Sequence, residues 1–455
     1  MPAQIATAVG LSALGGLVLV AVDDPLLMFA LCAAGILVGL GMVRPALLVS
    51  VFVLVRPLLD DYSGSQLGGV SSANPGGALG LLLLGSLTVL VAGVPRFFRP
   101  PQTWAFVAVL LVSAAAALNS LLSLGGTIGL KPVSELVRLS VLLAVYLLAA
   151  NLFREPNAVR RLFAMVGLSA VVPAVYGVYQ WAAGTVEVVE GFDLARITGT
   201  FSGPLPFSAY LAVAALVLIS LPADALKGWV RAPAAAVVLT ALVGTYSREG
   251  WVIFLLGVIL LFWRRHTERV LVIALVAAVV VAAVPAVGER VLPAESSDSS
   301  GGYSSYSWRI ANWRGLLAKA AERPLFGWGL ASTGYVNPRA PYSSQRVPGA
   351  GYDAHNTAVR ALVEGGVPLL AAYVLLFVTV LIRLRLLQRS RWELQPFART
   401  VYVIWIVLTF IAVATDDPLE QTAMMYAVLA LAGSLEGAHR LWLDTERPSP
   451  VAARP

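Results

Sequence analysis

The amino-acid sequence predicts an all-α polytopic membrane protein with about 12–14 transmembrane helices and one large extracytoplasmic loop that contains amphipathic helices. Composition is the first observation: 58% of the 455 residues are hydrophobic and only 13% are charged, with a mean hydropathy of +0.80. Soluble domains carry about a quarter charged residues, so a soluble globular protein is excluded. The second observation is that apolar segments repeatedly approach the roughly 20 residues that cross a bilayer.

The basic charge balance indicates membrane topology, and we expect no nucleic acid as a partner. The formal net charge is +7 and the isoelectric point is near 9.6, but the basic residues cluster in short loops between apolar segments. The single cysteine, Cys32, lies in an apolar run, so no intrachain disulfide is expected. The N-terminus lacks the features of a cleaved secretory signal, so we expect the first apolar segment to remain a membrane span.

Taken in order, the apolar segments predict fourteen spans. They lie near residues 5–22, 26–43, 46–59, 78–95, 103–124, 135–152, 162–183, 205–222, 233–247, 249–263, 269–287, 358–382, 400–415 and 424–441. Three of them (46–59, 233–247 and 249–263) are short, so twelve full spans with broken or partial helices fit equally well. The chain divides into an N-terminal transmembrane bundle (1–287), a large extracytoplasmic loop expected to hold the catalytic residues (288–357), C-terminal transmembrane helices (358–443) and a disordered cytoplasmic tail (444–455).

The distribution of arginine predicts the orientation. One set of alternate loops collects most of the basic residues, from Arg44 to Arg399, and this face is predicted to be cytoplasmic together with both termini. The extracytoplasmic face receives acidic turns such as Asp416-Asp417 and the long loop. Arginine is disfavoured on the translocated side, so each arginine that remains there needs a structural or functional reason.

Two outward arginines lie at breaks between apolar segments. Arg196 is in a turn, rich in glycine and proline, that leads back into the membrane at Leu205. Arg248 lies in a polar break between two short spans, and broken membrane helices commonly direct their free ends at ligands. A snorkelling arginine at the first break and a hairpin turn with an Arg248–Glu249 pair at the second are the simpler interpretations, and both stay open.

Within the long loop, residues 308–322 have helical spacing. An apolar stripe runs along this segment: Ile310, Trp313, Leu317 and Ala320. Arg309 flanks the stripe, and the pattern predicts an amphipathic helix at the membrane surface. Pro324 is expected to end the helix, and residues 332–352 are expected to form an irregular, mobile flap.

His355 lies in the first turn of the next span or just before it. Asp353 or Asn356 could cap this helix, and Asp353 could instead orient His355; we favour Asp353 as a cap. At about 100° per residue, Glu364 lies on the opposite side of the helix from His355. We therefore expect Glu364 to pair with Arg360 at the i,i+4 spacing.

These motifs resemble the O-antigen ligase and O-antigen polymerase superfamily of bacterial envelope glycosyltransferases, over roughly residues 190–380. The matching residues are Arg196-Ile-Thr-Gly-Thr-Phe-Ser-Gly-Pro, Ser247-Arg248-Glu-Gly, Arg309 with Trp313, Pro324-Leu-Phe-Gly-Trp-Gly, and His355-Asn followed by Glu364-Gly-Gly. The resemblance implies a GT-C-like enzyme of the bacterial cytoplasmic (inner) membrane that transfers a whole glycan from undecaprenyl diphosphate to an acceptor hydroxyl on the outer side. It also implies inversion at the anomeric carbon without a metal ion or another cofactor.

The residues themselves allow this chemistry. A departing diphosphate needs stabilisation of its growing negative charge, which arginine supplies by bidentate hydrogen bonding. The candidates for binding the diphosphate are Arg196, Arg248 and Arg309, of which the last two are also candidate catalytic residues. His355, the only outward histidine, is the candidate base, and its place at a helix N-terminus should favour the neutral form. The expected supporting residues are Asp353, Arg360, Glu364 and Trp313, and no residue is assigned to a metal.

The expected partners are an undecaprenyl-diphosphate-linked glycan donor, a glycan or lipid-linked acceptor, membrane lipids and other membrane proteins of polysaccharide assembly. Polymerisation of a surface polysaccharide is slightly favoured over ligation, because it requires no particular envelope type. One alternative is a polyprenyl-monophosphate-sugar glycosyltransferase, although the loop at Asp23-Asp24 is too short for such a site. Another is a transporter or flippase of lipid-linked glycan or of a small solute, although charges within the spans, such as Arg56 and Arg138, are sparse.

Overall fold

The computed structural model describes residues 44–60, 80–81, 83–88, 91, 97–188, 195–262, 305–338 and 353–446. The predicted spans at 5–22, 26–43 and 269–287, half of the span at 78–95, most of the flap and the tail beyond 446 lie outside these residues. The elements are α3 (Pro45–Val55), η1 (Arg56–Leu58), α5 (Thr103–Leu124), η3 (Gly125–Thr127), α6 (Lys131–Leu152), α7 (Pro156–Ser169), α8 (Val171–Ala183), β1 (Glu187–Val188), β2 (Ala195–Arg196), α9 (Pro204–Ser220), α10 (Gly228–Gly244), α11 (Arg248–Phe262), α14 (Ser305–Glu322), α15 (Thr333–Val336), α16 (Thr357–Arg389), α17 (Gln395–Ala414) and α18 (Thr422–Glu446).

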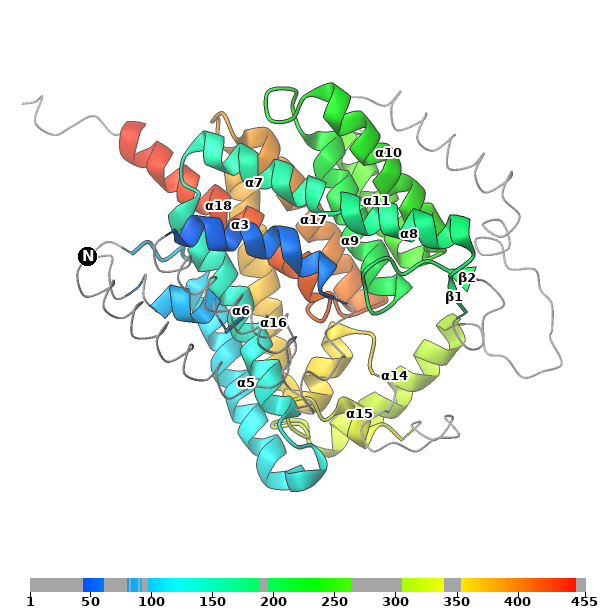
Figure 1. Ribbon diagram of the computed structural model, residues 1–455. Helices are drawn as coiled ribbons and strands as arrows, with labels where there is room; N and C mark the ends of the chain where they lie inside the picture. The colour runs from blue at the N-terminus through cyan, green and yellow to red at the C-terminus, as the bar shows by residue number, and fades with distance from the viewer. Residues whose placement is uncertain are drawn as a thin grey trace, which may run out of the picture.

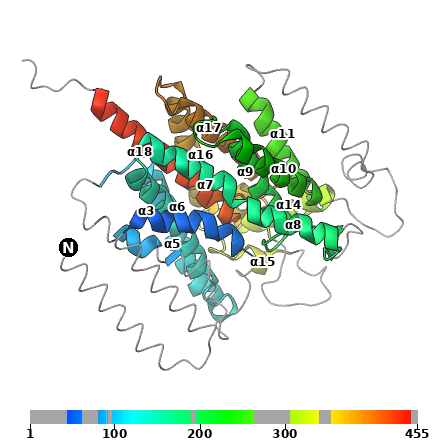
Figure 2. The ribbon, with the colours of Figure 1, turned by 45° about the horizontal axis from the view of Figure 1, so that its top comes forward.

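The helices confirm an all-α polytopic membrane protein. Among the described residues, five helical stretches are long and apolar enough to cross a membrane: Thr103–Thr127, Lys131–Leu152, Pro156–Ala183, Thr357–Arg389 and Gln395–Ala414. Shorter apolar helices are Pro45–Leu58, Pro204–Ser220 and Gly228–Gly244. Figure 2 shows α7 and α8 following each other along one line, as expected for a single stretch of membrane length. The one described strand pair, β1 with β2, is antiparallel and two residues long.

The long helices pack into a single apolar core. α18 lies against α6, α16 lies against α17, and α11 lies against α9 (Figure 1). The α6–α18 contact depends on Gly433 and Gly437, because a Cβ atom at either position would collide with a carbonyl oxygen of α6. This spacing of two small residues four apart lets membrane helices approach closely without a hydrophobic driving force between them.

Both arginines predicted to lie inside spans are paired. Arg56 forms an ion pair with Asp60 (Nη1–Oδ1 2.9 Å) and donates to Thr422 Oγ1 at 2.6 Å. Arg138 forms an ion pair with Glu135 one turn earlier in α6 and donates to the Leu419 carbonyl at 3.2 Å. These contacts offset the cost of burying charge, and they connect α3 and α6 to the segment around α18 that holds part of the site described below.

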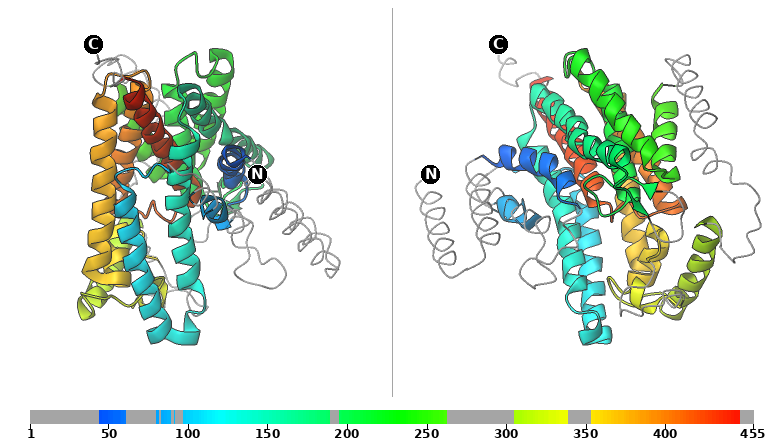
Figure 3. Two further views of the ribbon diagram at one scale, coloured as in Figure 1. Left: turned by 90° about the vertical axis from the view of Figure 1, so that its left-hand side faces the viewer. Right: turned by 45° about the vertical axis from the view of Figure 1, so that its right-hand side comes forward.

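α16 changes direction at Gly366, where the backbone is left-handed (φ 66°, ψ −159°). The segment Pro324–Leu330 fits against this break: Trp328 N donates to Val363 O at 2.7 Å and Gly329 N to Glu364 O at 2.9 Å. In return, Val367 N donates to Pro324 O at 2.8 Å. The carbonyl groups left without helical partners are therefore satisfied by the loop. Figure 3 shows the long part of α16 along the molecule, with α14 and α15 at its lower end.

Candidate active site

His355 lies two residues before α16 in a left-handed conformation, with φ of 47°. Asn356 caps the helix, because its Oδ1 accepts from Ala358 N and Val359 N, both at 3.0 Å. The preference for Asp353 as the cap is therefore wrong: its Oδ1 accepts from the adjacent Ala354 N at 2.7 Å. The amide of Asn356 also donates to Val413 O at 2.7 Å, which ties the start of α16 to the end of α17.

α14 holds the loop that carries His355. Trp313 Nε1 donates to Ala354 O at 2.7 Å, and Asn312 Nδ2 donates to Asp353 O at 3.0 Å. Two members of the predicted apolar stripe of α14, Trp313 and Ala320, lie on its buried side, but Leu317 is 43% exposed and Leu316 is fully buried in its place. The buried side packs against Ala354 and the first turns of α16, so protein covers the apolar face that was predicted to lie on the membrane surface.

His355 pairs with Asp416, a residue of the turn between α17 and α18. The Nδ1–Oδ1 distance is 3.1 Å, and the exposed fraction is 35% for the His355 side chain and 7% for that of Asp416. Burial lowers the pKa of His355, but the hydrogen bond and negative charge of Asp416, with the charge of Asp353, outweigh burial and raise it overall. The net direction is thus opposite to the expectation that the helix N-terminus favours the neutral imidazole, because the carboxylates of Asp416 and Asp353 stabilise the charged form.

A line of polar side chains continues behind Asp416. Gln421 Nε2 donates to Asp416 Oδ2 at 2.6 Å and to Glu249 Oε1 at 3.1 Å. All three side chains are buried, and they join the α17–α18 turn to the first turn of α11. None of the three had been assigned to the site. The sequence offered two signals: the outward acidic turn at Asp416, and Glu249 directly after a candidate arginine.

The three candidate arginines differ in their surroundings. Arg309, half-buried on α14, lies within electrostatic reach of His355 and Glu249. Arg248 is exposed as the first residue of α11, and the anticipated Arg248–Glu249 ion pair is not found within the described part of the chain. Arg196 is buried on β2, where its Nε donates to Thr245 O at 2.9 Å. Arg196 therefore lies against the break between α10 and α11 that immediately precedes Arg248.

Arg360 and Glu364 form the predicted i,i+4 ion pair, with Nε–Oε1 at 3.1 Å. Arg360 also lies 3.4 Å from Asp417 Oδ2 and 3.5 Å from Glu135 Oε2. Thr333 of α15 donates to Glu364 Oε1 at 2.9 Å. This buried network joins α6, α15, α16 and the α17–α18 turn. Its charged groups stabilise the elements around the site, and none of them contacts His355 in the hydrogen bonds described above.

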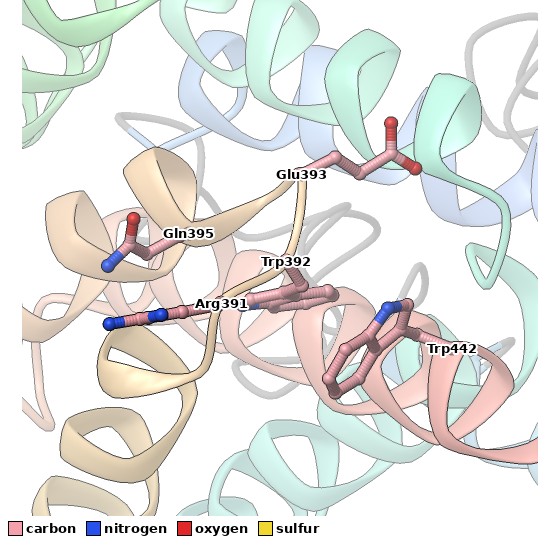
Figure 4. Close-up of a pocket in the computed structure, with 5 residues that line it drawn as sticks. All are labelled: Arg391, Trp392, Glu393, Gln395 and Trp442. Carbon is pink, nitrogen blue, oxygen red and sulfur yellow. The ribbon is translucent and has the colours of Figure 1, made fainter. Parts of the chain in front are cut away.

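A cavity of about 550 Å³ lies elsewhere in the molecule. It is lined by Arg391, Trp392, Glu393, Gln395 and Trp442 (Figure 4). Gln395 begins α17 and Asp416 follows the end of that helix, and at 1.5 Å per residue the 20 residues of α17 span about 30 Å. The cavity therefore belongs to the opposite end of α17 from the His355–Asp416 pair.

The fold and site define a multi-pass membrane protein with a histidine–carboxylate pair and arginines at the breaks and ends of its helices. Residues 233–374 match the family model described as O-antigen ligase, which supports the O-antigen ligase and polymerase superfamily indicated by the motifs. The matched region contains Arg248, Arg309 and His355, and it ends before Asp416. A comparison with curated proteins finds no match.

Proposed function

We propose that the protein is a metal-independent, inverting glycosyltransferase. It transfers a glycan en bloc from an undecaprenyl-diphosphate carrier to an acceptor hydroxyl on the outer side of the bacterial cytoplasmic membrane. The observation that carries the proposal is the 3.1 Å contact between His355 Nδ1 and Asp416 Oδ1, with the imidazole partly open to solvent. The O-antigen ligase match over residues 233–374 supports the reaction class.

The His355–Asp416 pair suits a general base. With Nδ1–H donating to Asp416, the neutral imidazole has its lone pair on Nε2, which can accept the proton of an acceptor hydroxyl. The acceptor oxygen then bonds to the anomeric carbon while the bond from that carbon to the diphosphate oxygen breaks. The electron pair leaves with the undecaprenyl diphosphate, and one displacement of this kind inverts the anomeric configuration.

The arginines suit the leaving group. Negative charge grows on the diphosphate as the bond breaks, and preorganised cationic donors stabilise that charge most effectively where water is excluded. Arg309 is the arginine that lies within electrostatic reach of the candidate base, so we assign it to the transferring end of the donor. Arg248 and Arg196 lie at the α10–α11 break, and we assign them to the rest of the diphosphate. Polymerisation of a surface polysaccharide remains our preferred outcome over ligation.

The first test supplies purified protein with an undecaprenyl-diphosphate-linked oligosaccharide in EDTA and resolves the products by mass. Wild type should release undecaprenyl diphosphate and lengthen the glycan, whereas His355→Ala and Arg309→Ala should lose transfer by roughly 10²-fold or more. His439→Gln is the matched control, since this buried histidine of α18 packs between Trp392 and Trp442 far from the site.

Three results would each contradict a different part of the proposal. Transfer that continues undiminished in both folded variants would remove His355 and Arg309 from the chemistry. Transfer by wild type that stops in EDTA and returns with a divalent metal would remove the metal-independent mechanism. A wild-type protein that moves the donor between leaflets of a vesicle, without forming a glycosidic bond, would instead be a flippase.

A further inference from the structure

Gln421 lies between two buried carboxyl groups. Its Nε2 donates to Asp416 Oδ2 at 2.6 Å and to Glu249 Oε1 at 3.1 Å, and Glu249 is only 6% exposed. Glu249 belongs to α11 and Gln421 to the turn before α18, 172 positions away. The amide therefore joins two distant elements directly behind the carboxylate that contacts His355.

Each carboxylate oxygen of Asp416 has a different hydrogen-bond partner. Asp416 uses Oδ1 for His355 and Oδ2 for Gln421, so its orientation is set from both sides. Gln421 has two amide hydrogens, and Glu249 accepts one, which leaves the other directed at Asp416. Within the described residues, Gln421 Oε1 has no hydrogen-bond partner, and buried Glu249 also faces the Asp416 carboxyl group directly. Burying such groups costs free energy, so a role beyond joining two helices is favoured.

We propose that Glu249 and Gln421 are positioning residues that hold Asp416 against His355 and thereby set the basicity of the imidazole. The inference rests on the proposed function, because it assigns a role within that reaction to two residues that do not contact the substrate. Gln421 acts on Asp416, Glu249 acts on Asp416 both through the Gln421 amide and by facing it directly, and Asp416 acts on the base.

The charges around His355 determine the direction of the effect. Asp416 faces it from the α17–α18 turn, Asp353 from its own loop and Arg309 from α14, while Glu249 of α11 faces Asp416 and Arg309. A buried carboxylate that loses its donor turns to another donor or takes up a proton. A carboxylate that turns away from His355 or becomes neutral stabilises the imidazolium less, and the pKa of His355 falls.

The test compares Glu249→Ala and Gln421→Leu with wild type in the glycan transfer assay. Each substitution should lower kcat about tenfold with little change in the donor KM, since loss of a residue behind a directly acting group commonly costs 10- to 100-fold. The acidic limb of the pH profile should move to lower pH in both variants. Glu249→Gln keeps an acceptor oxygen for the Gln421 amide and should stay within about threefold of wild type.

A double variant tests whether Glu249 and Gln421 act on the same group or independently. Because both residues act through Asp416, the Glu249→Ala/Gln421→Leu protein should lose much less activity than the product of the two single losses. Losses that multiply would show independent roles and overturn the proposal. Loss in Glu249→Gln as large as in Glu249→Ala would overturn it too, because the charge of Glu249 would then matter more than its hydrogen bond.

A second glutamine–glutamate bridge in the molecule provides the matched control. Gln102 Nε2 donates to buried Glu436 Oε1 at 2.9 Å, and Glu436 lies about 20 Å along α18 from the turn. Gln102→Leu should lower stability and leave the pH profile unchanged. If it moves the profile as far as Gln421→Leu does, the effect is structural and the proposal fails.

The pKa of His355 can also be measured without turnover. Diethyl pyrocarbonate modifies neutral imidazole, so the pH dependence of His355 modification, followed by peptide mass, reports its pKa directly. The midpoint should shift down in Gln421→Leu and stay in place in Gln102→Leu. An unshifted midpoint in Gln421→Leu would overturn the inference even while wild type transfers glycan, whereas an inactive wild type would count against the proposed function alone.

Discussion

His355 adopts a left-handed backbone that costs a residue with a side chain roughly 1–2 kcal/mol. Its neighbours on both sides hold this conformation, through the Trp313–Ala354 hydrogen bond and the Asn356 cap. In this conformation His355 Nδ1 lies 3.1 Å from Asp416 Oδ1. A residue held in this way at a helix start is typical of sites where geometry matters more than local stability.

The substitution Asp416→Asn tests the His355–Asp416 pair, because it replaces one carboxylate oxygen by an amide group. The charge and hydrogen bond of Asp416 raise the pKa of His355, so their loss should lower that pKa and move the acidic limb of the activity profile to lower pH. The rate on the plateau should fall by roughly 10²- to 10⁴-fold, because an asparagine can select the wrong tautomer of the imidazole.

Asp417→Asn is the matched control for this change. Asp417 accepts from Thr357 Oγ1 at 2.7 Å and lies near Arg360, but it has no hydrogen bond to His355 among the described contacts. It should lower stability while leaving the acidic limb in place. If the acidic limb of the pH profile does not move in Asp416→Asn, that limb reflects the ionisation of a group other than His355.

The sequence alone predicted part of this candidate site. His355 and Arg309 could be predicted because each lies in a recognisable local motif on the outward side. Asp416 and Glu249 could not, because their contacts with His355 and Gln421 join residues 61 and 172 positions apart. Such pairings depend on how the helices pack, and no local spacing encodes them.

At the scale of the element, α16 consists of two segments joined at Gly366. A Cβ atom there would collide with the Pro324 carbonyl, and φ of 66° disfavours any side chain. We expect Gly366→Ala to lower the free energy of unfolding by about 1–3 kcal/mol, a range typical of a strained backbone. Thermal unfolding in detergent, followed by the fluorescence of the 11 tryptophans, measures the change.

Gly126→Ala provides the comparison for that measurement. A Cβ at Gly126 meets no atom within 4 Å, so this variant should unfold close to the wild-type temperature. Equal losses in the two variants would show that the break in α16 tolerates a side chain. In that case the loop at Pro324–Leu330 does not depend on the glycine.

α14 shows that helical spacing predicts the presence of a helix more reliably than it predicts which face of the helix is buried. The stripe through Leu317 and the stripe through Leu316 both follow helical spacing. The observed one includes Asn312, which is fully buried because it donates to Asp353 O and accepts from Asn337 Nδ2 at 2.7 Å. A buried asparagine is invisible to a hydrophobicity pattern, so the orientation of the helix had to come from its partners.

At the scale of the whole molecule, the positive-inside rule predicts that the site lies outside the cytoplasm. We expect a cysteine at Leu130, which is 64% exposed at the α5–α6 turn, to react with a membrane-impermeant maleimide in intact cells or spheroplasts. A cysteine at Ser390, between α16 and α17, should react only after the membrane is opened. Both variants carry Cys32→Ser, since Cys32 is the only native cysteine. The reverse pattern of labelling would invert the orientation.

The 61-residue separation between His355 and Asp416 also has a consequence for biosynthesis. α16 and α17 lie between the two residues, so the ribosome must deliver both helices to the insertion machinery before the pair can form. In the predicted orientation the turn at residues 416–421 then has to be translocated, which we expect only as the last described helix, α18, is made. A nascent or truncated chain therefore lacks the assembled pair, so we expect the candidate base to become functional only on a fully synthesised protein.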